Sequence, residues 1–220
     1  MNLDWISKLP NQKQCNTFNR YSQHGEEVVL KKIFEQIGTT NQFFVDYGAG
    51  DGFNLSNTRA LKELGWSGLA MDGFYDTPEV KREFITPKNI VELYKKYDVP
   101  KEFDLLSQDL DSCDFHLLQH QIIHYKPRVI ICEFNPFFQD ESVYLAYEEG
   151  YTWDGTDKYG FSFECGKKWG ANSGYSLVYE NGCNLIFIKN EILGGYKDFN
   201  ITHSKKIVHP HNPNAKWLTY

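Results

Sequence analysis

Apolar and polar positions along the chain predict a succession of strands and helices. Apolar runs of strand length occupy 43–47, 67–72, 103–111 and 127–136, and 83–86 is a shorter candidate. Between these runs, apolar residues recur at helical spacing in 25–37, 57–65, 86–97 and 114–125. Strands that alternate with helices are typical of a parallel sheet with helices on both faces.

Capping residues set the expected starts of two of these helices. Ser56 is a candidate N-cap for the second helix, in which Leu61 and Leu64 are expected to point inward. For the third helix, Thr86 is a candidate N-cap and Pro87 a candidate first residue. We therefore expect both helices to begin immediately after these caps.

The last third of the chain contains a predicted hairpin. A weak helix is expected at 161–174, after a turn-rich stretch at 153–160. In YSLVYENGCNLIFIKN, two β runs are joined by Asn181-Gly182, which is typical of a type I′ turn. An ordinary dinucleotide-binding domain needs no such reversed strand, whereas the class I methyltransferase fold has one beside its fifth strand. Residues 195–220 are expected to form a tail or covering segment.

Length, charge and cysteine content narrow the class of protein. The 220 residues fit one α/β domain with additions, and 41% hydrophobic residues are enough for a core. The net charge of −6, without a Lys/Arg-rich run, disfavours nucleic acid as a partner. No apolar run approaches the roughly 18–20 residues of a membrane span, and the first residues lack the build of a signal peptide. Five cysteines without a C-x-x-C pair favour a reducing cytoplasm over a disulfide framework.

The stretch FFVDYGAGDGF at 43–53 runs a predicted strand into three glycines at every second position. A bare backbone is needed where a chain passes close to a ligand, and dinucleotides, nucleotide triphosphates and S-adenosylmethionine all bind over such turns. No G-K-[ST] follows the glycines, so the turn is not a P-loop. The dinucleotide motif G-x-G-x-x-G would need glycine at Phe53, whereas this turn reads G-x-G-x-G.

Acidic residues beside the turn favour a cationic ligand. Asp46 and Asp51 would repel a pyrophosphate, but they suit the ammonium and sulfonium groups of S-adenosylmethionine. Asp72, at the end of the next strand, could bind a ribose diol, a role that dinucleotide sites share. A nucleotide-dependent oxidoreductase and a turn that merely connects strand to helix remain alternatives.

Several blocks resemble the FkbM-like S-adenosylmethionine-dependent methyltransferases, in particular a bacterial and viral subgroup. They are YSQHGEE, FFVDYGAGDG, LSNTRALKELGWSGLAMDG, ITPKNI, VPKEFDLLSQDLD, YKPRVIICEFNP, WDGTDKYG and GYSLVYENGCNLIFIKN. The resemblance spans about 20–192 and implies an α/β, Rossmann-like class I methyltransferase fold: a mostly parallel seven-stranded sheet with a C-terminal antiparallel hairpin and helices on both faces. It divides the chain into an N-terminal extension (1–20), a methyltransferase domain (21–192) and a tail (193–220). It also implies S-adenosylmethionine as cofactor and hydroxyl groups of small molecules, sugars or glycans as methyl acceptors.

The donor site is expected around the glycine turn. Gln23, with His24 and Glu26 as further candidates, lies in the YSQHGEE block, which in relatives folds over the donor site. Ser56 and Asn57 could bind the methionine carboxylate through a hydroxyl and backbone N–H groups. A role of Ser56 as a helix cap explains that residue equally well. The expected donor-binding residues are Gln23, Asp46, Gly48, Gly50, Gly52, Ser56, Asn57, Asp72 and Asp109.

Acidic and amide side chains follow strands four and five of the predicted sheet, at the edge where ligands bind in such folds. Asp109, Glu133 and Asn135 are the candidate catalytic residues. Asp109 could act as general base toward an acceptor hydroxyl. Alternatively, the three could hold Mg²⁺ through oxygen ligands, similar to the acids and amide of catechol O-methyltransferase. Asp111 or Ser112 could instead cap the next helix.

One block departs from the family pattern. The relatives read close to I-D-I-D-G-N-D, whereas this chain has S-Q-D-L-D-S-C-D at 107–114. Gln108 replaces an apolar strand residue, and Ser112-Cys113 replace the glycine-asparagine turn. Two hypotheses follow: an enzyme with a different acceptor, or a non-catalytic protein that keeps the fold and the donor pocket.

The loop at 153–160 offers candidates for an acceptor pocket. Trp153, Asp154 and Tyr159 are expected either to line that pocket or to pack in the ordinary way. The three histidines of the tail lack a spacing that favours zinc. The sequence leaves the acceptor and the oligomeric state open.

Overall fold

The computed structural model describes residues 2–220 and contains one seven-stranded sheet. Its strands are β1 (Phe43–Tyr47), β2 (Ser67–Asp72), β3 (Val80–Arg82), β4 (Glu102–Gln108), β5 (Lys126–Glu133), β7 (Tyr175–Glu180) and β8 (Asn184–Lys189). The spatial order is β3-β2-β1-β4-β5-β8-β7, and β8 is the reversed strand, antiparallel to both β5 and β7. This is the Rossmann-like α/β arrangement, with a reversed strand beside β5, that the sequence predicts.

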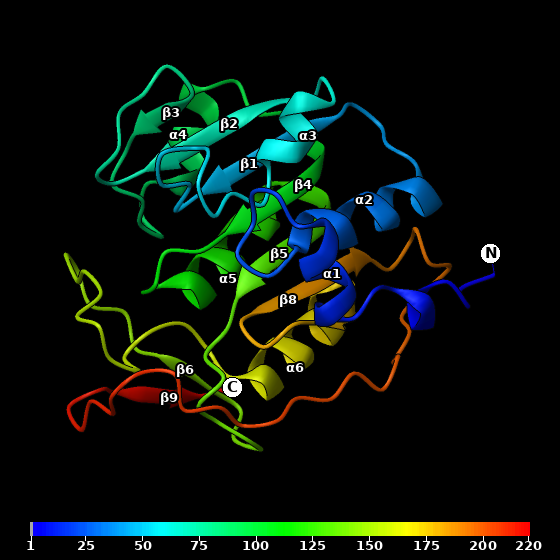
Figure 1. Ribbon diagram of the computed structural model, residues 1–220. Helices are drawn as coiled ribbons and strands as arrows, with labels where there is room; N and C mark the ends of the chain where they lie inside the picture. The colour runs from blue at the N-terminus through cyan, green and yellow to red at the C-terminus, as the bar shows by residue number, and fades with distance from the viewer. Residues whose placement is uncertain (1) are drawn as a thin grey trace.

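Helices cover both faces of the sheet (Figure 1). They are η1 (Ile6–Lys8), α1 (Gln12–Phe18), α2 (Glu26–Ile37), α3 (Arg59–Glu63), α4 (Ile90–Lys96), α5 (Asp114–His124) and α6 (Phe163–Ser173). Buried side chains of α1, α2 and α3 share one hydrophobic core, and those of α4, α5 and α6 share the other. Residues 129–132 of β5 alternate between these two cores, which explains why the centre of that strand is apolar at every position.

Two predicted boundaries near β3 and α4 are wrong. The third strand is formed by VKR at 80–82, directly before the EFIT segment at 83–86 that was expected to form it. α4 begins at Ile90 rather than at Pro87 after a Thr86 cap. Asn89 Oδ1 accepts the backbone N–H of Thr86 at 2.8 Å, so a turn precedes the helix. A three-residue polar strand carries no apolar pattern from which it could be predicted.

α3 is shorter than predicted, and Ser56 supports it from outside the helix. Thr58 directly precedes the helix, but it is Ser56 Oγ that accepts the N–H of Arg59, at 3.1 Å. Leu61 is buried as predicted. Leu64 is 62% exposed, because the helix has already ended there, so its predicted inward position is wrong.

β7 and β8 form the predicted hairpin, but its turn is not type I′. That turn type needs positive φ at both central residues, and of the two only Gly182 has it, at +99°. Asn181 instead turns its side chain inward, where Oδ1 accepts the N–H of Asn184 at 2.8 Å. Its Nδ2 donates to Glu26 of α2 at 2.7 Å. A contact between distant elements therefore overrides the local turn preference.

The C-terminal tail covers part of the body, as expected. β9 (Trp217–Thr219) pairs antiparallel with β6 (Val143–Leu145) in a separate small sheet beside α5 and α6 (Figure 1). His203 is buried, and its ring stacks on Phe163 of α6.

A membrane-spanning helix is not found among residues 2–220, since none of the helices there combines the necessary length and apolarity.

Candidate active site at the carboxyl edge of the sheet

A cavity of about 560 Å³ opens at the carboxyl ends of β1, β2 and β4, within the usual size of small-molecule sites. Its wall contains most of the expected donor-binding residues: Gln23, Asp46, Gly48, Gly50, Ser56, Asn57, Asp72 and Asp109. The remaining wall comes from Ser107 of β4, from the loops that follow β1, β2, β3 and β4, and from residues 151–153. The sequence thus located the cavity on the correct edge of the sheet.

Gly48 and Gly50 have different tasks in the glycine turn. Both have positive φ, +73° and +56°. A Cβ on Gly48 would lie 1.4 Å from the carbonyl oxygen of Asp109, so the missing side chain lets the loops after β1 and β4 meet. A Cβ on Gly50 would meet no atom of residues 2–220 within 4 Å. Gly50 is therefore the point where bare backbone in the cavity wall leaves room for a ligand.

Gly52 does not line the cavity, contrary to the sequence-based expectation. A Cβ there would lie 2.8 Å from Cγ2 of Val80, so this glycine allows close packing against β3. Asp51 closes the turn, because its Oδ1 accepts the N–H groups of Asn54 and Phe53, both at 2.8 Å. These hydrogen bonds lower the pKa of Asp51, which keeps a negative charge in the cavity wall.

Asp46 and Asp72 add two buried carboxyl groups to the wall. Thr58 Oγ1 donates to Asp46 at 2.6 Å, yet burial raises the pKa of Asp46 to about 6. Asp72 accepts the N–H of the central glycine on one oxygen and those of Phe74 and Tyr75 on the other. Asp72 therefore lies in the cavity wall, as predicted, and its hydrogen bonds also connect the glycine turn to the loop after β2.

Some wall residues carried no signal in the sequence. Leu55 has φ of +58°, lies 68% exposed and lines the cavity. A leucine in this left-handed region is uncommon and strained, and such strain is frequent at binding sites. Ser107, deeper in the wall, accepts a hydrogen bond from Asn57 Nδ2 at 3.3 Å. Neither residue belongs to a pattern that indicates a ligand.

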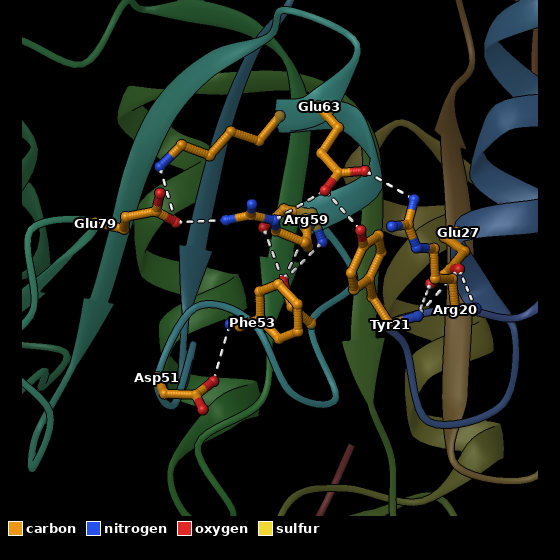
Figure 2. Close-up of polar contacts among 11 residues, drawn as sticks. Arg20, Tyr21, Glu27, Asp51, Phe53, Arg59, Glu63 and Glu79 are labelled. Carbon is orange, nitrogen blue, oxygen red and sulfur yellow. Dashed lines mark hydrogen bonds and ion pairs between the residues drawn. The ribbon is translucent and has the colours of Figure 1, made fainter.

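Residues 20–24 form a strap that lies beside the glycine turn and contributes Gln23 to the cavity wall. Ser22 pairs with Leu55 in a parallel β-bridge. Glu27, buried at the start of α2, accepts the backbone N–H groups of the first three strap residues (Figure 2). One carboxylate thus fixes the backbone that carries Gln23.

Side chains clasp the strap to the glycine turn and to α3 (Figure 2). Tyr21 donates its hydroxyl hydrogen to Glu63 at 2.6 Å, and its ring meets the ring of Phe53 edge-on, 5.2 Å between centroids. The guanidinium of Arg59 lies 4.9 Å from the centroid of Phe53 and pairs with Glu79 at 2.8 Å. The strap, the turn and the start of α3 therefore form one unit.

His24 and Glu26 lie outside the cavity wall, unlike Gln23. Glu26 is fully buried and accepts the N–H of His24 at 2.8 Å. Its other oxygen accepts from Nδ2 of Asn181 at 2.7 Å and of Asn184 at 2.9 Å. Glu26 thus joins the strap to the β7–β8 hairpin. Both acids of YSQHGEE, Glu26 and Glu27, therefore accept hydrogen bonds from backbone N–H groups of the strap.

Asp109, Asp111 and Glu133 bring three carboxyl groups together beyond β4 and β5, with one oxygen of each within 4.8 Å of the others. The two aspartates line the cavity. Glu133 Oε2 is buried and finds no hydrogen-bond partner in the part of the chain that the structure describes. Burial, reinforced by the neighbouring carboxylates, raises the pKa of Asp109 and Glu133 well above the usual range and that of Asp111 to about 6. Such a group favours the uptake of protons or of a cation.

Asn135 does not join this group, contrary to the sequence-based prediction. Its Nδ2 donates to the carbonyl oxygens of Asp157 at 2.7 Å and Tyr159 at 3.1 Å. Its Oδ1 accepts the N–H of Phe137 at 3.0 Å, and the residue lines a separate small depression. The amide is thus used to hold the loop that follows β5, and Asp111 takes the third place among the acids.

Gln108, the polar residue in an otherwise apolar strand position, belongs to a buried hydrogen-bond network. Its Oε1 accepts from the hydroxyl of Tyr47 at 2.5 Å and from Nε2 of Gln121 at 2.9 Å. Its Nε2 donates to the carbonyl oxygen of Asp114 at 2.6 Å. A buried amide with both ends paired is stabilising rather than disruptive.

The turn that replaces glycine-asparagine is held by Asp114. Its carboxylate accepts the N–H groups of Leu110 and Ser112, both at 3.0 Å. Asp111 has φ of +53°, a region that aspartate tolerates better than most residues. Neither Asp111 nor Ser112 caps α5, since Cys113 occupies the cap position without a side-chain hydrogen bond. The altered block therefore forms an ordered turn that leaves Asp111 with the other acids.

Of the three candidates in the 153–160 loop, only Trp153 reaches the cavity. Its ring meets that of His209 from the tail, 4.9 Å between centroids. Asp154 shapes the loop by accepting the N–H of Thr156. Tyr159 is buried, and burial together with the charge of the nearby acids raises its pKa.

No family model matches the chain, and the curated proteins contain no match to it.

Proposed function

We propose that the protein is an S-adenosylmethionine-dependent methyltransferase that methylates a hydroxyl group of a small molecule, sugar or glycan. The observation that carries the proposal is the acid-flanked glycine turn, whose open Gly50 faces a cavity of about 560 Å³. The reversed β8 beside β5 and the sequence blocks similar to FkbM-like methyltransferases support it.

The donor is assigned to the end of the cavity at β1 and β2. The ionised Asp51, with Asp46 and Asp72, gives that end a negative potential that attracts the ammonium and sulfonium of the donor and would repel a pyrophosphate. Asp72 also stands where a ribose diol would be bound in folds of this type. Gln23 from the strap closes the same end.

The acceptor is assigned to the end of the cavity at Asp109 and Asp111, and Trp153 also lines the cavity. The acceptor oxygen would attack the donor methyl carbon in line with the carbon–sulfur bond, whose electron pair leaves with sulfur. The hydroxyl proton would pass to the carboxylate of Asp109. In its ionised form, an aspartate with a raised pKa is a stronger base than an ordinary aspartate, and positioning of the two reactants supplies much of the rate.

A hard divalent cation such as Mg²⁺ fits the same acids, which offer only oxygen donors and include the unpartnered Glu133 Oε2. Asp109, Asp111 and Glu133 would hold it. When bound, such a cation would orient an acceptor hydroxyl and lower its pKa.

A second candidate is a non-catalytic protein that binds S-adenosylmethionine. The altered 107–114 block motivates it, because the family turn beside the acids has been replaced. The ordered turn around Asp114 speaks for a retained site, and only an activity measurement separates the two candidates.

Calorimetry with S-adenosylmethionine, S-adenosylhomocysteine and NAD tests the donor. We expect both sulfur nucleosides to bind in the roughly micromolar range and NAD to give no heat. Binding of NAD with no response to either sulfur nucleoside would end the proposal. A screen for transfer of labelled methyl groups to glycans and phenols, with Asp109→Asn as inactive control, separates enzyme from binding protein.

A further inference from the structure

Three neighbouring strands place their oxygen-bearing side chains in one row at the carboxyl edge. Ser107 of β4 pairs with Ile131 of β5, so the residues two positions further along, Asp109 and Glu133, share that face of the sheet. Glu133 in turn pairs directly with Asn184 of β8. Directly opposite residues of an antiparallel pair point to the same side. Asn184 is therefore the next side chain in the row after the two acids.

Asn184 presents an unpaired oxygen in this row. The residue is only 4% exposed, and its Oδ1 has no hydrogen-bond partner within the described residues 2–220. Its Nδ2 is already committed, because it donates to Glu26 at 2.9 Å. A buried acceptor without a partner costs about 1–3 kcal/mol. Glu133, which lies opposite Asn184 in the strand pairing, carries the other buried oxygen of this row without a partner among residues 2–220, its Oε2.

The spacing of the acids matches a cation bound between them. Oxygen ligands lie about 2.1 Å from Mg²⁺ and roughly 2.3–2.6 Å from Ca²⁺, so opposite ligands are separated by about 4–5 Å. The three carboxylates each bring an oxygen within 4.8 Å of the others. Four oxygen donors with no nitrogen or sulfur among them select hard cations.

We propose that Asp109, Asp111, Glu133 and the Oδ1 of Asn184 form a binding site for a hard divalent cation. Asn184 supplies the amide ligand that the sequence assigned to Asn135. The inference deepens the proposed function and rests on it for the use of the cation. Binding of the cation itself needs neither donor nor acceptor.

The site is also connected to the strap beside the donor end. Asn184 holds Glu26 through Nδ2, and Glu26 holds the N–H of His24, next to Gln23 in the cavity wall. An amide that binds the cation through oxygen and Glu26 through nitrogen is fixed at both ends. Cation binding should therefore slow amide hydrogen exchange in the strap.

The site is tested by titrating the full-length protein with Mn²⁺ in the absence of nucleotide. Calorimetry and electron paramagnetic resonance monitor the binding. We expect one saturable site for which Ca²⁺ and Mg²⁺ compete. Glu133→Gln should weaken the binding at least about tenfold, and Asn184→Ala should do so by a similar factor.

Asn181→Ala is the matched control, since Asn181 also donates to Glu26 but its Oδ1 is occupied by backbone N–H groups. It should bind Mn²⁺ like the unchanged protein. Asn184→Ser provides a second, less disruptive variant, and circular dichroism checks that each variant is folded.

Absence of saturable Mn²⁺ binding to the unchanged protein overturns the proposal. Equal affinity in the two Asn184 variants and the Asn181 control overturns the role of Asn184. A separate titration with S-adenosylhomocysteine in EDTA reports on the donor site alone. Donor binding without Mn²⁺ binding would refute the cation site and leave the proposed function standing. Mn²⁺ binding without donor binding would refute the proposed function and leave the cation site standing.

Discussion

At the scale of single residues, Gly48 and Gly50 divide the work of the glycine turn. Gly48 lets the carbonyl of Asp109 approach, and Gly50 leaves space in the cavity wall. Both tasks require a missing side chain, but only the second concerns a ligand. Substitutions should therefore separate stability from binding.

Gly50→Ala should cost about 1–2 kcal/mol of stability, since its φ of +56° is unfavourable for alanine. Gly65→Ala should cost a similar amount, because Gly65 has φ of +90°, also has open space around it and lies outside the cavity wall. Only Gly50→Ala should weaken S-adenosylhomocysteine binding, by about tenfold or more. Urea unfolding and calorimetry on the two variants check this, and equal binding by both would contradict it.

Asp46 should make stability depend on pH. Its pKa is raised from 3.8 to about 6 by burial, so the folded protein holds that proton more tightly than the unfolded chain. The resulting stabilisation is complete below about pH 4 and is lost as pH rises through 6. Asp46→Asn avoids this loss and should be more stable than the unchanged protein at pH 7.5, by on the order of 1–3 kcal/mol.

Urea unfolding of both proteins at pH 7.5 and pH 4 measures the effect of Asp46. Near pH 4 the difference should become small, because the carboxyl is then largely protonated in the folded state. The same variant should bind a cationic donor more weakly. An equal difference in stability at both pH values would show that the carboxyl charge is not its cause.

At this scale, the sequence predicts the chemical type of the site residues better than it predicts which side chains lie next to one another. Asp109 and Glu133 meet as predicted, because parallel strands end at a common edge. Asn135 was misassigned, since no local pattern shows that its amide turns toward the loop at 157–159. Asn184 could be placed only once the pairing of β5 with β8 was known.

At the scale of elements, the strap depends on Glu27. Glu27→Gln should destabilise the protein by about 1–3 kcal/mol, because a buried carboxylate that accepts several backbone N–H groups becomes a weaker acceptor. Hydrogen exchange of the amides at 20–22 should become faster, and S-adenosylhomocysteine should dissociate faster.

Glu35→Gln is the control for Glu27, because Glu35 also lies on α2 but forms only an exposed pair with Lys32. It should change stability by less than about 0.5 kcal/mol. Hydrogen exchange followed by mass spectrometry compares the two variants. Unchanged exchange at 20–22 in Glu27→Gln would show that the other contacts of the strap, such as the Ser22–Leu55 bridge and the Tyr21–Glu63 hydrogen bond, hold it without Glu27.

Element predictions succeeded where the pattern was long and failed where distant contacts decide. α2, α5 and β5 carry apolar residues at regular spacing, and their observed bounds lie close to the predicted ones. The short β3 and the turn at Asn181 have no such pattern. At Asn181 the buried Glu26 decides the geometry, and Glu26 lies far away in the sequence.

At the scale of the whole molecule, the alternation of strands and helices predicts a parallel sheet covered on both faces, and the resemblance to a known fold implies the reversed strand, but neither predicts the position of the tail. Four backbone hydrogen bonds join the tail to residues 136–157, in addition to the pairing of β9 with β6. The tail also packs His209 against Trp153, which lines the cavity. The tail thus shapes the acceptor side of the site, although the donor side lies on other elements.

Removal of residues 196–220 should therefore affect the two ends of the cavity differently. Stability should fall by at least about 2–3 kcal/mol, given roughly 0.5–1.5 kcal/mol for each lost hydrogen bond and the exposure of Phe163 beneath His203. The loop at 147–160 should become sensitive to proteases. S-adenosylhomocysteine should still bind within about threefold of the full-length affinity, since the hydrogen bonds of Asp46, Gly50 and Asp72 all go to residues outside the tail. Limited proteolysis and calorimetry on the shortened chain measure both effects, and loss of donor binding from a folded product would show that the tail supports the whole cavity.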